Sequence, residues 1–420
     1  MTNTVKPTRD FGIPLLIYTI IMGILKLTVL KGSGILDTLA FSAFAGAAFF
    51  ATSLPMQTWA RITIAVLVLA IGVPIIGMGN TFYLDVAINI GIYAALALGL
   101  NIVVGFAGLL DLGFIAFYAV GAYTWGLFGS SQANNFIAGN HFPLAGDWWF
   151  LFVILAVIAA GTFGVLLGLP VLRLKGDYLA VVTLGFGEVI RVLANNLDKP
   201  TNFTNGPQGI SAIGRPLVSV ADGLEKSFGQ QSFKWELLLL YALVIIIIGF
   251  AVLLTIRLDH SKIGRAWVAI REDEVAAQAM GVPLLSTKLI AFATGASFSG
   301  AMGALFAAKQ TFISPESFNF DASVGILAMV VLGGLGSIQG ALLGAFIVSV
   351  LNFQILPALG TLFNDLRNAG VPLSTAFEVS KYQRFIFGII LIVMMIFRPQ
   401  GLIAAARRLT APPKEEVDPA

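Results

Sequence analysis

The sequence has no cysteine, only two histidines and few charged residues. Without cysteine, disulfide bonds and thiolate metal sites are excluded. His141 and His260 are too few for a zinc site or a histidine-based catalytic triad, both of which need more converging groups. Basic residues are not interleaved with aromatics in a long run, so we expect no nucleic-acid partner.

Charge is scarce and apolar residues are abundant. Of the 420 residues, 11% are charged and 57% are hydrophobic, whereas a soluble domain usually carries about 25% charged residues. A soluble fold of this length could not bury so much apolar surface, so lipid must solvate much of it. The 45 glycines agree with this, because glycine is commoner in transmembrane helices than in soluble ones. The sequence therefore predicts an integral membrane protein.

A nucleotide-binding loop is also missing from the sequence. No G-x-x-x-x-G-K-[ST] pattern occurs, so we expect this chain not to hydrolyse ATP. The glycine-rich stretch Gly333–Ser337 lies between two apolar segments without a following lysine, and it predicts a tight turn between helices. Too few acid, base or metal-binding groups converge for a membrane enzyme.

Apolar runs predict an all-α transmembrane bundle with about ten to twelve spans. Segment 177–195 contains two charges and segment 321–335 is short, so both are left open as broken or re-entrant helices. The expected spans lie near residues 11–30, 35–54, 61–79, 82–104, 109–128, 149–172, 177–195, 237–257, 286–308, 321–335, 338–356 and 382–400.

The distribution of lysine and arginine predicts an orientation. The apolar stretch Phe11–Leu25 follows Lys6 and Arg9 without an A-x-A-like cleavage site, so we interpret it as an uncleaved first span. Lysine and arginine are more numerous on the side that carries Lys6, Arg9 and the loop 258–285. By the positive-inside rule, we expect that loop and both termini to be cytoplasmic.

Two hydrophilic insertions are predicted on the opposite side. Ser130–Trp149 and Asp198–Trp235 are rich in Asn, Gly and Pro, which is typical of turns and surface loops. Small residues recur at every fourth position in the span 286–308. They predict close helix packing within the subunit, with a subunit interface or a pore lining left open. This small face consists of Ala291, Gly295, Ser299, Gly303 and Ala307.

The segment 258–285 combines helix-forming residues, dense charge and apolar anchors. Ile263, Trp267 and Ile270 share one helical face. Arg271–Glu274 then places four charges in a row, and Gly281 followed by a proline ends the helix. We therefore predict two short helices that meet at a charged corner.

This charged corner leaves two alternatives, a helix on the membrane surface or a docking site for a protein. Interfacial helices usually place lysine and arginine on the polar face. The acidic run Glu272, Asp273 and Glu274 would instead meet anionic lipid. A protein partner therefore fits the corner better.

Polar residues within apolar segments are candidates for a translocation path. Glu188 and Arg191 are three residues apart and favour a self-neutralising ion pair, with a role in substrate passage as the alternative. The helix around them is expected to be broken by neighbouring glycines. The candidate residues for the path are Glu188 and Arg191 with the nearby Gly185 and Gly187, and, as weaker candidates, Asn101, Asp111 and Asn89.

Four stretches and a closing motif carry a family resemblance. They are Gly99–Gly105 with Gly108–Leu110, Leu174–Glu188, Gly264–Gly281 and Ser314–Ser337, followed by Arg398–Leu402. Together they resemble the permease subunits of branched-chain amino-acid ABC importers, of the LivM type. The resemblance covers about residues 85–404, and it divides the chain into variable N-terminal helices (1–80), a permease core (81–404) and a cytoplasmic tail (405–420).

The resemblance implies partners for the chain. They are a second, LivH-type permease, two cytoplasmic ATPase subunits that bind ATP and Mg²⁺, and a periplasmic binding protein for leucine, isoleucine or valine. The chain itself would bind no cofactor and would lie in the bacterial inner membrane.

The resemblance also implies that loop 262–283 seats in a groove of the ATPase. Ala276-Ala277 followed by Gly281 resembles the E-A-A-x-x-x-G pattern of importer permeases, with Val275 where the glutamate would stand. The implied coupling residues are Gly264, Arg265, Trp267, Ile270, Arg271, Glu272, Asp273, Glu274, Ala276, Ala277 and Gly281.

Two alternatives to branched-chain amino-acid import stay open. ABC permeases for urea or short amides are close relatives within the same class. An ion-coupled secondary transporter is a different class, and it would use buried carboxylates, for which Glu188 and Asp111 are the candidates.

Overall fold

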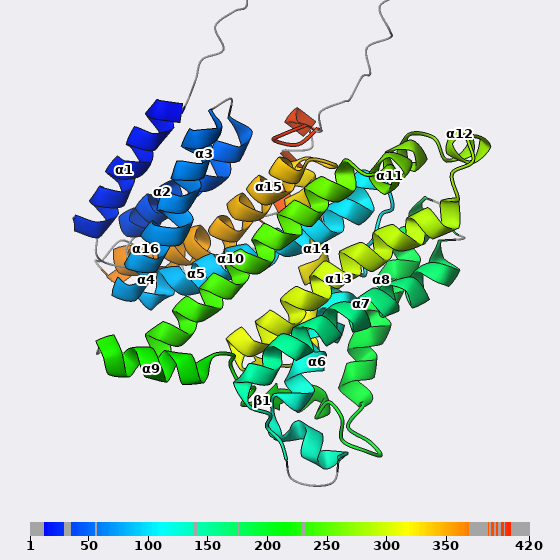
Figure 1. Ribbon diagram of the computed structural model, residues 1–420, viewed down its shortest axis with the longest axis horizontal. Coiled ribbons are helices and arrows are strands. Elements are labelled where there is room, and N and C mark those ends of the chain that lie inside the picture. Colours follow the sequence, from blue (N-terminus) through cyan, green and yellow to red (C-terminus); the bar gives the residue numbers. More distant parts are fainter. Residues whose placement is uncertain are drawn as a thin grey trace, which may run out of the picture.

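A computed structural model gives the fold of the chain (Figure 1). It describes residues 12–28, 35–54, 57–137, 141–172, 174, 176–228, 232–368, 385, 388–389, 392–393, 396–398 and 400–404. The expected cytoplasmic tail lies outside these residues, and most of the expected span 382–400 does too.

The described residues form helices with one short pair of strands. In chain order the elements are α1 Gly12–Thr28, α2 Ile35–Ser53, α3 Thr58–Ala65, the π-helix η1 Val66–Gly72, α4 Val73–Gly79, α5 Thr81–Leu100, the π-helix η2 Asn101–Phe106, α6 Ile115–Phe128, the 3₁₀ turns η3 Ser131–Asn135 and η4 Gly146–Trp148, α7 Trp149–Val171, α8 Asp177–Asn196, the 3₁₀ turn η5 Gly206–Gln208, β1 Ile210–Ser211, α9 Val218–Phe228, α10 Ser232–Asp259, α11 Lys262–Glu272, α12 Glu274–Ala279, α13 Leu284–Gln310, β2 Phe312–Ile313, the 3₁₀ turn η6 Pro315–Phe318, α14 Phe320–Gly333, α15 Ile338–Val350, the π-helix η7 Leu351–Ile355 and α16 Leu356–Asn368.

The predicted transmembrane bundle is confirmed. Eight helical segments of the described chain are long and apolar enough to cross a membrane, and α1, α2 and α6 contribute shorter apolar helices. These eleven helices correspond to the first eleven expected spans, and the span 382–400 falls mostly outside the described residues. The chain is a multi-pass membrane protein.

The helix α13 crosses the centre of the bundle and packs against α5, α6 and α7 (Figure 1). Its small face makes this packing possible. A Cβ added to Gly303 would lie 2.1 Å from the Tyr118 carbonyl oxygen of α6, and one added to Gly295 would lie 2.8 Å from the Gly99 carbonyl oxygen of α5. The prediction of close packing within the subunit is therefore confirmed.

The two segments left open as broken helices are both continuous. α8 runs without interruption through Gly185 and Gly187, so the break expected before Glu188 is wrong. α14 is likewise a regular helix. The irregular backbone lies instead at residues 107–114, before α6. With 14 residues, α6 is only about 21 Å long at 1.5 Å per residue, shorter than a hydrocarbon core of about 30 Å.

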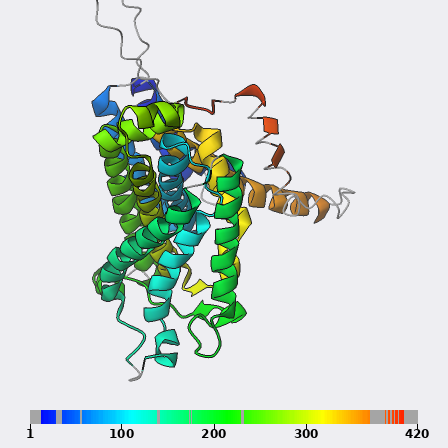
Figure 2. The same ribbon diagram turned by 90° about the vertical axis from the view of Figure 1, so that its right-hand side faces the viewer.

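The two ends of the bundle differ in structure. At one end, which we name the α11–α12 end, two short helices join α10 to α13 (Figures 1 and 2). At the other end, the β1–β2 end, Ile210 pairs with Ile313 and Ser211 with Phe312 in an antiparallel pair. The insertion after α8 also contains α9, an 11-residue helix that the turn-rich sequence did not predict.

Candidate functional site

The segment between α10 and α13 forms two short helices, as the sequence predicts. Ser261 caps α11, its hydroxyl accepting a hydrogen bond from the Gly264 amide at 3.2 Å. Asp273 has an extended backbone and ends α11. Its carboxylate also accepts hydrogen bonds from the Val275 and Ala276 amides at 2.9 and 3.0 Å, which caps α12. The corner therefore depends on the capping carboxylate of Asp273.

The apolar face of α11 is anchored on the bundle. Trp267 is fully buried, and its indole Nε1 donates a hydrogen bond to the Thr287 carbonyl of α13 at 2.8 Å. Ile270 is buried one turn further on. Gly264 lies so close to the end of α10 that an added Cβ would fall 2.2 Å from the Leu258 carbonyl oxygen.

Arg271 connects the corner to the irregular segment before α6. Its guanidinium donates a hydrogen bond to the Gly105 carbonyl. Gly108 has a φ of +70°, and an added Cβ would lie 2.6 Å from the Arg271 Cγ. Glycine at this position thus permits both the positive φ and the close approach of the arginine side chain.

Glu274 connects the corner to α13. Its carboxylate lies 2.8 Å from the Lys288 ammonium, and the Lys288 side chain is only 5% exposed. Glu272 differs, since its side chain is 70% exposed and its carboxylate lies 3.6 Å from Arg271. The two glutamates therefore differ in role, since Glu274 is tied to α13 whereas Glu272 is largely exposed.

Two large apolar side chains are exposed in α12 and at its C-cap. Val275 and Met280 are 71% and 85% exposed. Neither was among the candidate residues, although an apolar side chain within a charged loop is the signal that would have identified them. Ala276 and Arg265 are also exposed, Ala277 is buried, and Gly281 ends the segment with a φ of +84°. The segment thus combines a firmly anchored inner face with an exposed side on which Val275 and Met280 stand among polar and charged residues.

Glu188 and Arg191 form the expected ion pair at 2.9 Å. Arg191 also contacts Glu316 of η6 at 2.7 Å, a partner that the sequence did not predict. The three side chains are between 26% and 68% exposed. The cluster joins α8 to η6 on the surface of the chain.

Asp111 and Gly187 lie on the two sides of the contact between the irregular segment and α8, and both are next to Gly113. The Asp111 carboxylate accepts a hydrogen bond from the Gly113 amide at 2.9 Å. The Thr183 hydroxyl of α8 accepts one from the Leu112 amide at 3.0 Å. A Cβ on Gly187 would lie 3.3 Å from the Gly113 Cα. These residues hold the irregular backbone in place.

Asn101 lies elsewhere, at the turn between α14 and α15. Its amide nitrogen donates to the Ser337 carbonyl at 3.3 Å, and its oxygen accepts from the Gly336 amide at 2.9 Å. This turn is the one that the sequence predicted at Gly333–Ser337. Asn101 is fully buried and fixes the turn.

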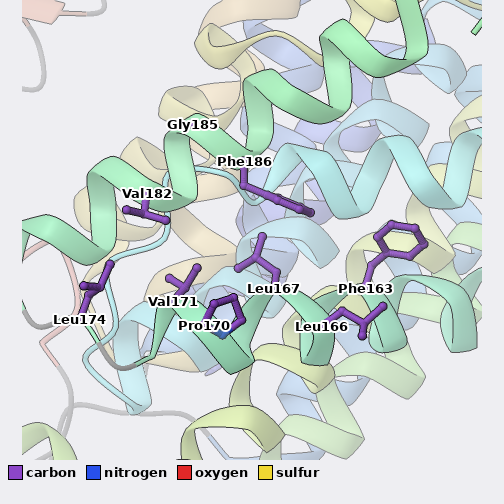
Figure 3. A pocket seen from close by; sticks show the side chains of 9 residues that line it. All are labelled: Phe163, Leu166, Leu167, Pro170, Val171, Leu174, Val182, Gly185 and Phe186. Carbon is purple, nitrogen blue, oxygen red and sulfur yellow. The ribbon is translucent and has the colours of Figure 1, made fainter.

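Gly185 lines a groove between α7 and α8 with a volume of about 700 Å³. Figure 3 shows Phe186 of α8 pointing toward the α7 side chains Phe163 and Leu167. The lining carries no charged residue, so it offers no partner to a charged molecule. Its members are Phe163, Leu166, Leu167, Pro170, Val171, Leu174, Val182, Gly185 and Phe186. The six candidates for the path therefore lie in four separate environments.

The chain is thus a multi-pass helical bundle with two short helices projecting between two of its spans. Residues 82–395 match the family model described as the branched-chain amino acid transport system permease component, and the chain belongs to this family.

Curated relatives agree with this assignment. The chain is 38% identical to the high-affinity branched-chain amino acid transport system permease protein LivM of Escherichia coli, over 82% of this chain and 75% of that protein. It is 26% identical to a probable LivM of Methanocaldococcus jannaschii, over 78% and 94% of the two chains. It is 22% identical to the LivH permease of Escherichia coli, over 74% and 91%. No solved structure matches the chain.

Proposed function

We propose that this chain is the LivM-type half of a permease pair in an ATP-driven importer of leucine, isoleucine and valine. In this proposal, a LivH-type permease forms the other half, and a periplasmic binding protein delivers the amino acid. Two cytoplasmic ATPase subunits bind ATP and Mg²⁺. The similarity to proteins named as LivM and LivH supports both the substrate class and the pairing.

The α11–α12 segment is the proposed contact with the ATPase. The observation that carries this proposal is the contrast between its two faces. Trp267, Arg271 and Glu274 bind it to the bundle, whereas Val275 and Met280 are exposed. An exposed apolar pair beside charged residues suits a protein interface, because apolar side chains gain from burial and rim charges fix orientation.

The proposed orientation follows from this contact. The α11–α12 end faces the cytoplasm, where the ATPases bind, and the β1–β2 end faces the periplasm. The chain lies in the bacterial inner membrane, with both termini on the cytoplasmic side. The lysine and arginine distribution of the sequence supports this arrangement.

Replacement of both Val275 and Met280 by aspartate tests the contact. We expect the ATPase subunits to stop co-purifying with the permease pair and uptake of labelled leucine to cease, because two charges would have to be buried unpaired in the interface. The membrane level of the variant should equal that of the wild type, since neither side chain packs on the bundle. Val220→Asp is the matched control, because Val220 is an exposed apolar residue of α9 at the opposite end.

Normal co-purification of the ATPase with the doubly substituted chain would refute the docking role. The substrate class needs its own measurement, namely uptake of labelled leucine and of labelled urea by cells that lack redundant transport systems. Equal leucine uptake with and without the gene would refute amino-acid import. Gene-dependent uptake of urea would instead support an amide permease.

A further inference from the structure

A polar triad spans α5 and α13 near the β1–β2 end. The Lys309 ammonium lies 2.8 Å from the Asp85 carboxylate and donates a hydrogen bond to the Asn89 side-chain oxygen at 3.1 Å. The Asn89 amide nitrogen donates to the other Asp85 oxygen at 3.1 Å. Each of the three side chains thus contacts the other two.

The triad is open on one side. The Lys309 side chain is 4% exposed, whereas the Asp85 side chain is 44% exposed. On α5, Asp85, Asn89 and Tyr93 are each four residues apart and share one face. Between Ile88 and Leu100, Asn89 and Tyr93 are the residues that are not fully buried. Asp85, Asn89 and Tyr93 thus form a polar, half-buried strip along one face of α5.

A second ion pair of the chain serves as a comparison, because it is almost fully enclosed and joins helices. Lys26 of α1 lies 3.2 Å from Asp37 of α2, and the two side chains are only 3% and 13% exposed. Lys26 also donates to the Tyr83 hydroxyl at 2.9 Å, which ties the first two helices to α5. Asp85 differs from Asp37 because its carboxylate is not enclosed by this chain.

Contact with lipid does not account for the exposure of the Asp85 side chain. A charged side chain within a membrane span faces the bundle interior or a water-filled cavity, because exposure of the charge to hydrocarbon is costly. The strip of Asp85, Asn89 and Tyr93 therefore faces water or a polar molecule. The triad offers both signs of charge at one place, which is the complement of an amino acid with a free ammonium and a free carboxylate.

Aromatic rings lie beside the triad. Phe306 precedes Lys309 by one turn of α13 and packs against Tyr118 with 5.2 Å between ring centroids. Tyr93 follows Asn89 by one turn of α5 and packs against Phe353 at 5.6 Å. The charged triad would match the ammonium and carboxylate of an aliphatic amino acid, and the aromatic rings would match its apolar side chain.

We propose that Asp85, Asn89 and Lys309 bind the charged head of the transported amino acid as it passes the β1–β2 end. Asp85 and the Asn89 oxygen accept hydrogen bonds from the substrate ammonium, and Lys309 donates to the substrate carboxylate. When no substrate is present, the triad closes on itself. This assignment deepens the proposed function and depends on it.

The first test removes both charges at once, so that no unpaired charge stays buried. Asp85→Asn combined with Lys309→Met should assemble with its partners and keep basal ATP hydrolysis, because replacement of a buried pair by neutral groups is often tolerated. Uptake of labelled leucine into proteoliposomes that contain the complete importer should fall about tenfold or more, since charge-assisted hydrogen bonds are lost. Lys26→Met with Asp37→Asn is the matched control, and it should keep uptake. Wild-type uptake by the Asp85/Lys309 variant would overturn the proposal.

The second test leaves the ion pair intact. Because the chain has no cysteine, Asn89→Cys introduces a single thiol for a membrane-impermeant methanethiosulfonate reagent. Leucine with its binding protein and ATP should slow the labelling of this thiol at least about threefold if the head group occupies the triad. Ser227→Cys, on the exposed end of α9, is the control and should be labelled at the same rate with and without leucine. A labelling rate for Asn89→Cys that leucine does not change would overturn the binding role, even if the first double variant failed to assemble.

Different results would overturn the binding role of the triad and the proposed import function. If the wild-type complex takes up leucine but Asn89→Cys is not protected, the triad is only structural and the import function stands. If the wild-type complex takes up no leucine, both proposals are overturned.

Discussion

Gly121 of α6 and Gly300 of α13 are in direct backbone contact, since a Cβ on Gly121 would lie 2.0 Å from the Gly300 carbonyl oxygen. A Cβ on Gly300 would in turn lie 2.5 Å from the Ala156 carbonyl oxygen of α7. Helices in lipid gain little hydrophobic energy from association, so such close backbone approach supplies much of the packing. α13 therefore packs between α6 and α7 so closely that neither Gly121 nor Gly300 has room for a side chain.

The first prediction concerns this contact. Gly121→Ala should lower the stability of the chain by about 1 to 3 kcal/mol, because the added methyl group must force α6 away from α13. Gly249→Ala on α10 is the control, since a Cβ there meets nothing within 4 Å and alanine favours a helix over glycine. Thermal unfolding in detergent measures both variants. Equal midpoints for Gly121→Ala and the wild type would contradict the packing.

The second prediction separates two adjacent acidic residues. Glu274→Ala should destabilise the corner by about 2 kcal/mol, because the buried Lys288 ammonium loses its partner. Glu272→Ala should cost less than about 1 kcal/mol, because that carboxylate is largely exposed and its contact with Arg271 is screened by solvent.

Limited proteolysis of the loop, followed in detergent, reports this difference. Cleavage between α11 and α12 should accelerate in Glu274→Ala and stay at the wild-type rate in Glu272→Ala. Faster cleavage in the Glu272 variant than in the Glu274 variant would show that the ion pair with Lys288 does not hold the corner.

The third prediction concerns Asn101. Asn101→Ala should cost about 1 to 3 kcal/mol, because the partly buried Gly336 amide loses its partner and the buried Ser337 carbonyl keeps only its hydrogen bond from the Ala341 amide. Asn196→Ala, at the exposed end of α8, should leave the midpoint within a degree or so, since surface substitutions change stability little.

Thermal unfolding and leucine uptake, measured on the same preparation, distinguish the two roles considered for Asn101. If Asn101 fixes the turn, its replacement lowers the unfolding midpoint, and protein that stays folded at low temperature still transports leucine. Loss of uptake at an unchanged midpoint would assign Asn101 to the path instead.

Local patterns made α11 and α12 predictable. The spacing of Ile263, Trp267 and Ile270 marks the buried face, and Asp273 and Gly281 carry the start and stop signals of the second helix. All of this information lies within about two dozen neighbouring residues, so it can be read along the chain. The bundle was predictable for the same reason, since each span is an apolar run.

Contacts between distant segments were not predictable in this way. Asp85 and Lys309 are far apart in the sequence, and each lies in an unremarkable apolar run. The same is true of Arg191 and Glu316. Which charges meet depends on how the helices are arranged, and apolar periodicity does not specify that arrangement.

Two local features of the structure differ from the prediction made from the sequence. The apolar run 109–128 was expected to be one span, but Gly108 with its positive φ and the contact of Gly113 with Thr183 keep the backbone irregular until α6 begins. The insertion 198–235 is rich in turn residues, and this composition concealed the amphipathic α9. Tertiary contacts thus override the apolar composition before α6, whereas in α9 the amphipathic pattern overrides the surrounding turn residues.

A single straight element connects the two proposed sites. α13 has 27 residues and is about 40 Å long at 1.5 Å per residue. Its first turns are bonded to α11 and α12 through Thr287 and Lys288, and its last turn holds Lys309. The proposed contact with the ATPase and the proposed binding site for the amino acid thus share one continuous helix, with no loop between them.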